Sequence, residues 1–252
     1  MDLIRRNRME RMLIIPDLHL DAAEEIHPAY AVVRKFAKSF QPDAVLFLGD
    51  VLDLPYIAIF NKDNVKVLSR GSFTKDYDLW NRELDYWQSL TGKVYIREGN
   101  HEERIGRLLQ KNMTLRGSIE IEDRCQYQKR GIRYARVLDL PTKIGHCNFI
   151  HGWYTNLYHP KKTLLKMGAN IAYGHTHDVQ NFSVKAMAQE HEMCAWSLGC
   201  LCDIQPEWVK GRPMDWMHAF GEFYVNRKTG MFNLYPVRMF NNEFIWDGHL
   251  WK

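Results

Sequence analysis

The sequence lacks the features that mark membrane-spanning, exported and repetitive proteins. No apolar run in its 252 residues approaches the roughly 20 residues that a membrane-spanning helix needs. The N-terminal segment MDLIRRNRMERMLII is basic, but Pro16 and Asp17 interrupt its apolar stretch too early for a secretory signal. No internal repeat and no linker rich in proline, glycine and serine divides the chain. We therefore expect a single cytoplasmic domain over residues 1–252, without a membrane partner.

Cysteine is scarce and odd in number. The five cysteines form no even-numbered disulfide framework, and a chain of this size does not need covalent cross-links to fold. Cys200 and Cys202 have no second pair that would complete four zinc ligands. We therefore expect them to be ordinary strand residues in a reducing compartment.

A strong charge of one sign is also absent. The net charge is +4 and the isoelectric point is near 8.7, with lysine and arginine scattered along the chain. This balance favours anionic substrates without identifying a nucleic-acid partner. Hydrophobic residues make up 46% and charged residues 25% of the chain, which is typical of a globular domain.

Five short apolar segments, each followed by polar side chains, are the most informative feature that is present. They are MLIIPDLHL, AVLFLGDVLD, KVYIREGNHE, HCNFIHGW and ANIAYGHTHD. Such β-prone runs predict buried strands of an α/β sheet, and helical periodicity between them predicts helices within 27–40, 76–90 and 102–112. After residue 178, alternating segments around a turn at 228–230 predict a second sheet.

The polar residues that follow these segments are types that bind metal ions. The carboxyl ends of strands in an α/β sheet meet at one edge, so these side chains should converge. On an extended backbone, residues two positions apart point to the same side, which pairs Asp17 with His19 and His175 with His177. The predicted ligands are Asp17, His19, Asp50, Asn100, His151, His175 and His177.

Seven ligands of carboxylate, imidazole and amide type exceed the need of one ion and suit two divalent ions with one shared carboxylate. Gly49, Gly99 and Gly174 precede three of the ligands and permit sharp turns there. Two such ions bring about four positive charges and the aspartates with a bridging hydroxide return about three, which favours phosphoesters over amides. The ligand mixture favours Mn²⁺, with Fe/Zn, Ni²⁺ and Mg²⁺ as alternatives.

The ordered series DLH, GDVLD, GNHE, HG and GHTH resembles the calcineurin-like metallophosphoesterase superfamily over residues 17 to about 200. The resemblance implies an α/β (α+β) fold with four αββα layers, in which two mixed sheets lie between helices. It also implies a dinuclear centre at the sheet edges. Asp17, His19, Asp50 and His177 would hold one ion, and Asp50, Asn100, His151 and His175 the other.

The resemblance further implies in-line attack of a metal-bridging hydroxide on phosphorus. His101 would protonate the leaving alkoxide or orient the phosphoryl group, and Asp53 would fix its tautomer. Gly99 would provide the turn that directs Asn100 toward a metal ion and His101 toward the substrate. A helix N-cap role fits Asp53 nearly as well. In another context, His151 alone would more often be a packed core histidine.

Two positions depart from the protein Ser/Thr phosphatases of this superfamily. Leu54 stands where those enzymes carry a phosphate-binding arginine, and Leu20 stands in place of a glycine, which weakens a phosphoprotein substrate. Arg104 or Arg97 would replace the missing arginine, although a solvated helix face suits Arg104 about equally. Further candidate substrate contacts beside His151 are Trp153 and Tyr154, although aromatic residues at strand ends commonly serve packing.

Residues 55–95 form a candidate substrate-shaping insertion in which aromatic and basic residues alternate, as suits stacked bases and a phosphate backbone. Trp80 and Trp87 instead have the spacing of core residues, and Asp178 has the position of a turn residue. The preferred hypothesis is a phosphodiesterase or nuclease acting on a nucleotide or nucleic acid. A phosphomonoesterase of proteins or small molecules is the alternative. A non-catalytic scaffold is least favoured because no ligand position is lost.

Overall fold

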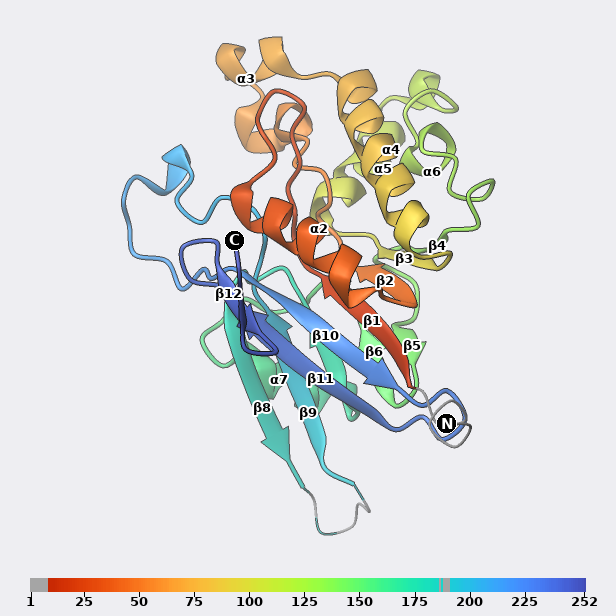
Figure 1. The fold of residues 1–252 in the computed structure, drawn as a ribbon. Coiled ribbons are helices and arrows are strands. Elements are labelled where there is room, and N and C mark those ends of the chain that lie inside the picture. The colour runs from red at the N-terminus through yellow and green to blue at the C-terminus, as the bar shows by residue number, and fades with distance from the viewer. Residues whose placement is uncertain (1–8, 186, 188–190) are drawn as a thin grey trace.

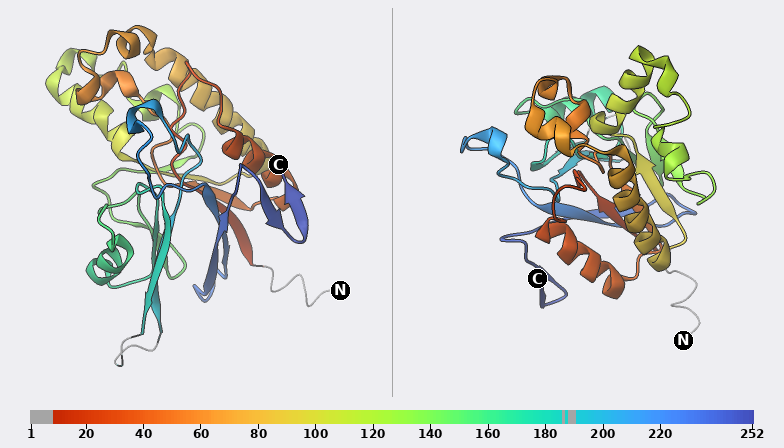
Figure 2. Two further views of the ribbon diagram at one scale, coloured as in Figure 1. Left: turned by 90° about the vertical axis from the view of Figure 1, so that its left-hand side faces the viewer. Right: turned by 90° about the horizontal axis from the view of Figure 1, so that it is seen from above.

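The computed structural model describes residues 9–185, 187 and 191–252. Two mixed β-sheets face each other and carry helices on their outer sides (Figures 1 and 2), which confirms the predicted four-layer α/β fold. The prediction that the N-terminal segment is no secretory signal falls partly on residues 1–8, which lie outside the described residues. Among the described residues, no helix is long and apolar enough to cross a membrane.

The larger sheet has six strands. They are β1 (Glu10–Ile15), β2 (Ala44–Phe47), β3 (Val94–Arg97), β4 (Arg133–Ala135), β10 (Ala219–Val225) and β11 (Phe232–Arg238). The strand order is β11-β10-β1-β2-β3-β4. Strands β1 to β4 run parallel, whereas β10 is antiparallel to both β1 and β11.

The second sheet has five strands in the order β5-β6-β7-β9-β8. They are β5 (Thr142–Ile144), β6 (Cys147–Phe149), β7 (Ile171–Tyr173), β8 (Val179–Val184) and β9 (Met193–Leu198). The prediction of a second sheet after residue 178 is therefore wrong about which strands form that sheet. Strands β5 to β7 precede that point. Strands β10 and β11 belong to the larger sheet instead, because β10 pairs with the free edge of β1 and β11 pairs with β10. The predicted turn at 228–230 does join β10 to β11.

Helices cover both sheets. They are α2 (Pro28–Phe40), α3 (Val65–Arg70), α4 (Phe73–Leu90), α5 (Asn100–Lys111), α6 (Ile121–Arg124) and α7 (His159–Met167). Single 3-10 turns are η1 (Pro55–Ile57), η2 (Ile59–Asn61), η3 (Met113–Leu115) and η4 (Glu207–Val209). In the left view of Figure 2, α7 lies outside the second sheet and α2 outside the larger one. A hairpin of β12 (Phe244–Trp246) and β13 (His249–Trp251) packs on α2 through ring contacts with Phe36.

Strands β2, β3, β6 and β7 are buried along their whole length because both of their faces are covered. Along β1, Leu13 and Ile15 belong to the core beneath the helices, whereas Met12 and Ile14 belong to the core between the sheets. The ring of Phe47 in β2 lies 5.1 Å from Trp80 and 5.7 Å from Trp87 of α4, measured between centroids. The predicted core role of both tryptophans is confirmed.

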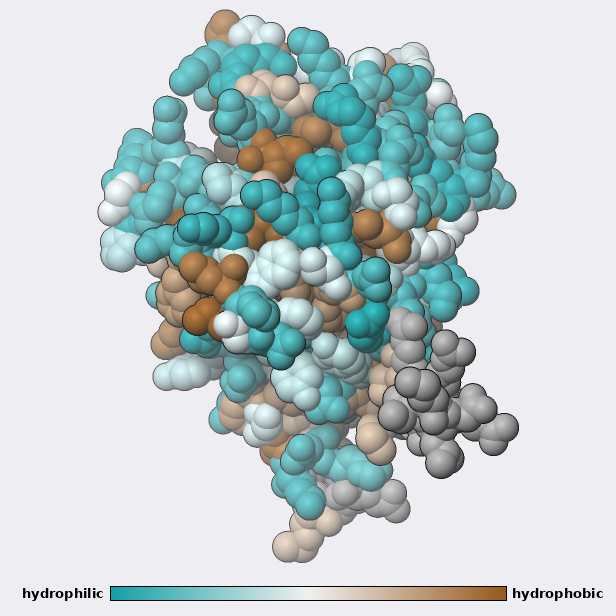
Figure 3. All heavy atoms as spheres, in the orientation of Figure 1, coloured by the Kyte–Doolittle hydropathy of each residue, from teal (hydrophilic) through white to brown (hydrophobic). Residues whose placement is uncertain are grey.

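The predicted insertion at 55–95 has a surface part and a core part. Its first part, η1 to α3, leaves the side chains of Ile59 and Phe60 each 76% exposed. Its second part is the core helix α4 followed by the start of β3. The molecular face in Figure 3 is largely hydrophilic over the helices, and its exposed hydrophobic residues form small separate patches.

Candidate metal centre

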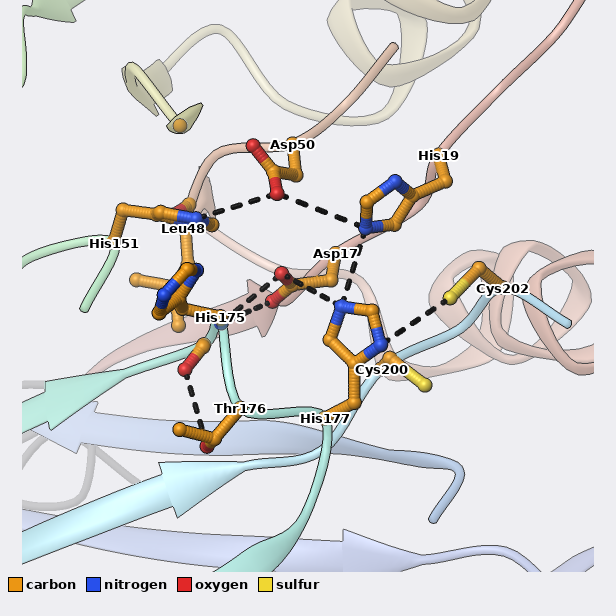
Figure 4. A network of polar contacts seen from close by, with 12 residues as sticks. Asp17, His19, Leu48, Asp50, His151, His175, Thr176, His177, Cys200 and Cys202 are labelled. Atoms are coloured by element: carbon orange, nitrogen blue, oxygen red, sulfur yellow. Dashed lines mark hydrogen bonds and ion pairs between the residues drawn. The ribbon is translucent and has the colours of Figure 1, made fainter. Parts of the chain in front are cut away.

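All five apolar segments end at one place, where the edges of the two sheets meet. Asp17 and His19 follow β1, Asp50 follows β2, Asn100 and His101 begin α5 after β3, His151 follows β6, and His175 and His177 follow β7. The larger sheet thus supplies the first five of these residues and the second sheet the last three. Figure 4 shows most of them pointing toward a common centre.

Asp50 lies at the middle of this cluster. Its Oδ2 atom is 3.3 Å from His151 Nε2 and 3.7 Å from both His19 Nε2 and His101 Nε2. Its Oδ1 atom accepts a hydrogen bond of 2.8 Å from the backbone N–H of His101. The residue is only 2% exposed. One buried carboxylate oxygen therefore faces three imidazole nitrogen atoms.

Two groups of ligand atoms meet at Asp50. In the first, His177 Nε2 lies 3.3 Å from Asp17 Oδ1 and 3.2 Å from His19 Nε2. In the second, the ligand atoms of Asp50, His151 and His175 lie within 4.8 Å of one another. Asn100 Oδ1 joins the second group at 2.9 Å from His151 Nε2. The structure thus brings together all seven predicted ligands in the two sets that the family resemblance implies.

The chemistry of these donors fits divalent cations. A cation held by nitrogen and oxygen ligands at about 2.0–2.2 Å separates neighbouring ligand atoms by roughly 3 Å. The distances among Asp17, His19 and His177 are of this size. In addition, the Nε2 atoms of His19 and His177 lie 3.2 Å apart, so that both can be directed at one cation when the two rings are neutral.

The ligand-bearing turns differ from the extended backbone that the sequence analysis assumed. The φ angles of Asp17, His19, Asp50, His175 and His177 are 23°, 46°, 48°, 69° and 59°. All five residues therefore lie in the left-handed region, where non-glycine residues are strained and functional sites are common. Asp17 and His19 do address the same group. His175 and His177 address different groups, so their predicted pairing at one point is wrong.

The glycines before the ligands have two different roles. Gly49 has a φ of +101°, which supports the predicted sharp turn. Gly99 lies in the turn from β3 into α5, but its φ of −98° is open to any residue, so this turn does not need a glycine for its backbone conformation. A Cβ atom at Gly99 would instead lie 2.1 Å from Asp50 Oδ1, and one at Gly174 would lie 2.0 Å from Asp17 Oδ2. These two glycines make room for carboxylates.

The aspartates and histidines of the cluster shift one another's pKa values. Burial raises the pKa of Asp50, but the His151 and His101 rings lower it well below its usual range. Burial lowers the pKa of His151, and Asp50 then raises it to about 10. Burial likewise lowers the pKa of His177, and its hydrogen bond with Asp17 raises it to about 9. Without a cation, protons on these two imidazoles balance the buried carboxylates.

His101 and Asp53 lie at the open side of the cluster. His101 Nδ1 is 2.6 Å from the Asp53 carbonyl oxygen and 3.1 Å from Asp53 Oδ1, so this nitrogen carries the proton. Asp53 Oδ1 also lies 3.1 Å from His19 Nδ1. The alternative role of Asp53 as a helix N-cap is wrong, because Leu54 occupies that position before η1 without a side-chain cap.

The two candidate arginines differ in position. Arg97 is 2% exposed and donates hydrogen bonds to the carbonyl oxygens of Leu140 and Arg136, so it serves the fold. Arg104 Nη1 donates to the Asp53 carbonyl oxygen at 3.1 Å. Its guanidinium carbon lies 5.7 Å from the ring centroid of Phe60. Arg104 therefore faces the rim of the cluster rather than bulk solvent.

Trp153 and Tyr154 follow His151 on a surface turn. Trp153 is 45% exposed, and its ring centroid lies 6.5 Å from that of Tyr154. The Tyr154 ring also contacts Lys162, whose Nζ lies 4.0 Å from the ring centroid. These contacts do not involve His151 and assign the two aromatic residues no substrate role.

Glu102 is a buried residue of the site that the sequence analysis did not single out. Its Oε2 atom accepts hydrogen bonds of 2.9 Å from the backbone N–H groups of Asp50 and Gly99, and its Oε1 atom accepts one of 3.0 Å from Leu52. Burial and the nearby Asp50 raise its pKa to about 7. Glu102 thereby joins the turns after β2 and β3. Its place in the third position of α5, three residues after Gly99, was the available signal.

Asp178 lies in the bend between β7 and β8, as predicted, and is also a buried acceptor. It is 5% exposed and accepts hydrogen bonds from His159 of α7 at 2.8 Å, Thr176 at 2.7 Å and Ser197 of β9 at 2.8 Å. These bonds hold the turn that carries His175 and His177. His159 and Ser197 are distant in sequence, so no local pattern revealed these two contacts.

The loop after β9 contributes further groups beside His177. Both cysteines of this loop are buried outside the named strands. Cys200 forms an isolated β-bridge with His218, whereas Cys202 lies in a bend, so the prediction of an ordinary strand residue is wrong for Cys202. Cys202 Sγ lies 4.0 Å from His177 Nδ1. The ring of Trp216 packs on His177 with 4.3 Å between centroids. Since Trp216 lies 39 positions after His177 in the sequence, spacing gave no indication of this contact.

The chain is similar to a curated phage protein and to two solved structures. It is 22% identical over 257 residues to the "Gene 54 protein" of Mycobacterium phage D29, covering 96% of this chain and 99% of that protein. A Vps29 single mutant from Entamoeba histolytica has 12% identity and a TM-score of 0.42, covering 91% of this chain and 99% of the other. Vps29 from Chaetomium thermophilum has 12% identity and a TM-score of 0.43, covering 91% and 96%.

A family profile gives the decisive comparison. The profile described as calcineurin-like phosphoesterase matches residues 10–179, more than half of the chain. The match includes the strands β1, β2, β3, β6 and β7 and every residue of the two ligand groups. The chain therefore belongs to the calcineurin-like phosphoesterase family, whose members are metal-dependent hydrolases of phosphoesters.

Proposed function

We propose that this metal-dependent phosphoesterase works with two divalent ions and cleaves phosphodiesters of nucleotides or nucleic acids. The convergence of three Nε2 atoms on the single buried oxygen Asp50 Oδ2 carries the proposal. A carboxylate in that position suits a ligand shared by two ions. The ions would be held by Asp17, His19, Asp50 and His177 in one group and by Asp50, Asn100, His151 and His175 in the other.

When bound, two such ions supply a nucleophilic hydroxide at neutral pH and neutralise charge on the phosphoryl group. The chain's own residues orient the reaction. The Nδ1–H group of His101 donates a hydrogen bond to Asp53, and its Nε2 atom faces Asp50 at the centre of the cluster. There it can protonate the leaving oxygen as attack occurs from the opposite side. Burial lowers the pKa of His101, but Asp50 and Asp53 raise it above its ordinary value, which favours the acid form.

The rim of the cluster supports a substrate with groups on both sides of the phosphate. Arg104 contacts Asp53 and Phe60, Trp216 contacts His177, and the His19 ring lies between Asp53 and His177 with one nitrogen toward each. A phosphodiester has two such groups and a monoester has one. Aromatic rings near cationic side chains suit the bases and phosphates of a nucleic acid.

Mn²⁺ is the first choice for the ions, because the ligand groups mix imidazole with carboxylate and amide oxygen. Fe/Zn, Ni²⁺ and Mg²⁺ are the alternatives. The five cysteines are free thiols, which supports a reducing cytoplasm as the compartment. A phosphomonoesterase of proteins or small molecules is the second candidate function.

The proposal is tested by comparing bis-p-nitrophenyl phosphate with p-nitrophenyl phosphate in Mn²⁺, for the native chain and for Asp50→Asn. We expect the diester to be preferred, and Asp50→Asn to lose metal affinity by more than about 100-fold together with activity. The exposed Asp78→Asn on α4 is the matched control and should change neither. Preference for the monoester would favour the second function. If the protein took up no Mn²⁺ and cleaved neither substrate, only the hypothesis of a non-catalytic scaffold would stand.

A further inference from the structure

The loop between β9 and β10, residues 199–218, carries two tryptophans toward the surface beside the metal centre. The Trp216 ring contacts His177 with 4.3 Å between centroids, and the Trp208 ring lies 5.6 Å from that of Trp216. The three rings form a row that begins at a predicted metal ligand and ends at the surface. The loop projects as a light blue segment at the left of Figure 1.

Core packing does not account for this row. Trp208 is 59% exposed and Trp216 is only partly buried, whereas tryptophan in folded proteins is highly buried on average. The residue after Trp208, Val209, is 1% exposed and anchors the loop in the protein. The Val209 carbonyl oxygen also accepts hydrogen bonds from Arg212, through both its backbone N–H and its Nε–H. The fold therefore holds Trp208 outward on an anchored turn.

The neighbouring insertion reaches this loop. Lys66 Nζ of α3 lies 3.8 Å from Glu207 Oε2, directly before Trp208. The insertion also carries Lys62 and Arg70 on exposed positions, where they pair with Asp63 and Glu24. One cationic side chain, Lys66, thus approaches the aromatic row, while the ligand cluster lies at its inner end. Aromatic rings with a cationic side chain beside them are groups with which proteins bind single-stranded nucleic acid.

We propose that Trp208 and Trp216 form a stacking site for a nucleobase on the group esterified to the reacting phosphate. This inference rests on the proposed function and names its substrate class. Trp216 touches His177. A base that stacks beside Trp216 would therefore be separated from the phosphate at the metal centre by only a few covalent bonds of its own nucleotide. Stacking on tryptophan tolerates any base, because every base has a π-face. The site therefore favours substrates that carry a base but does not distinguish one base from another.

The test compares the dinucleotide TpT with an analogue that has the same phosphodiester but lacks both bases. Trp208 is the residue to change, because Trp216 contacts a metal ligand. In Mn²⁺, we expect the native chain to cleave TpT with a higher kcat/KM than the abasic analogue by about 5- to 100-fold. Trp208→Ala should remove most of this preference and leave cleavage of the abasic analogue unchanged. Trp208→Phe should retain most of it.

Binding of short single-stranded DNA in EDTA, measured by fluorescence anisotropy against an abasic strand, separates stacking from catalysis. A base-dependent affinity that falls in Trp208→Ala supports the stacking site even if no activity is found. If bis-p-nitrophenyl phosphate is not cleaved in Mn²⁺, the proposed function fails by itself. Equal binding and cleavage of base-containing and abasic strands by the native chain overturns the stacking site. So does an equal loss on both substrates in Trp208→Ala.

Discussion

At the scale of single residues, the centre depends on one buried carboxylate. Asp50 Oδ2 lies within 3.7 Å of the Nε2 atoms of His19, His101 and His151. A buried charge of this kind is stable only when it is paired. His101 and His151, whose pKa values are raised, provide that pairing by carrying protons, and a cation would provide it by taking their place.

His101 is expected to act on turnover and not on metal affinity. It touches Asp53 and faces Asp50 but belongs to neither of the two proposed ligand sets. We predict that His101→Ala lowers kcat by about 10²- to 10⁴-fold, the usual effect of removing a general acid, and retains bound Mn²⁺. Metal content by mass spectrometry and kcat on bis-p-nitrophenyl phosphate check this. His249→Ala, at an exposed position, is the control. A parallel loss of metal would show that His101 is a ligand.

The candidate ligands were legible in the sequence because each stands directly after an apolar segment. Asp50 after Gly49 and Asn100 after Gly99 are local patterns of this kind. The buried acceptor role of Asp178 was not predictable, because two of its partners, His159 and Ser197, lie 19 positions away on either side. Contacts that depend on the three-dimensional arrangement leave no periodic trace in the chain.

At the scale of elements, the turn from β3 into α5 is held by close contact between backbones. A Cβ atom on Gly99 would lie 2.2 Å from the Asp50 backbone nitrogen, whereas one on Gly106, in the exposed middle of α5, meets nothing within 4 Å. We predict that Gly99→Ala destabilises the fold by about 1–3 kcal/mol through overpacking and loses Mn²⁺. Urea unfolding and metal content would measure both effects.

Gly106→Ala is the matched control in the same helix. Alanine has a higher helix propensity than glycine, so this change should stabilise the protein by about 0.5–1 kcal/mol and leave metal binding intact. If Gly99→Ala behaved like Gly106→Ala, the close approach of the two turns would not matter for the centre.

The five strands that carry ligands were predictable, since each is a continuous apolar run of the kind that both covered faces of a sheet require. Their division between two sheets was not. Strand β10 pairs with β1, more than 200 positions earlier, through the register Glu10 with Val225. Such a pairing depends on which edge is free after the earlier strands have assembled, and alternation within 219–225 does not reveal it.

At the scale of the whole molecule, protons and metal ions compete to hold the two sheets together. His151 follows a strand of the second sheet and pairs with Asp50 of the larger one, as His177 does with Asp17. In the metal-free protein these contacts raise the pKa of His151 to about 10 and that of His177 to about 9. Both values lie above the 6.5 expected of an unfolded histidine.

The free energy of unfolding of the metal-free protein should therefore fall as the pH rises from 7 to 10. In this window the folded chain binds more protons than the unfolded chain, so stability decreases with pH. The stabilisation is fully present below pH 6.5 and is lost through the two folded pKa values. Urea unfolding in EDTA at several pH values measures it. With Mn²⁺ bound the dependence should weaken, because ligation requires neutral imidazoles. If the free energy of unfolding of the metal-free protein did not change over this pH range, the pairing of His151 with Asp50 and of His177 with Asp17 would be contradicted.

The position of β1 between β2 and β10 has a consequence for biosynthesis. Translation proceeds from the N-terminus, so β1 carries an open edge until residues 219–225 have left the ribosome. Asp17 and His19, at the end of that strand, reach a closed sheet only when nearly the whole polypeptide has been made. A nascent chain stalled before residue 219 would therefore leave this edge of β1 unpaired beside the candidate ligands Asp17 and His19.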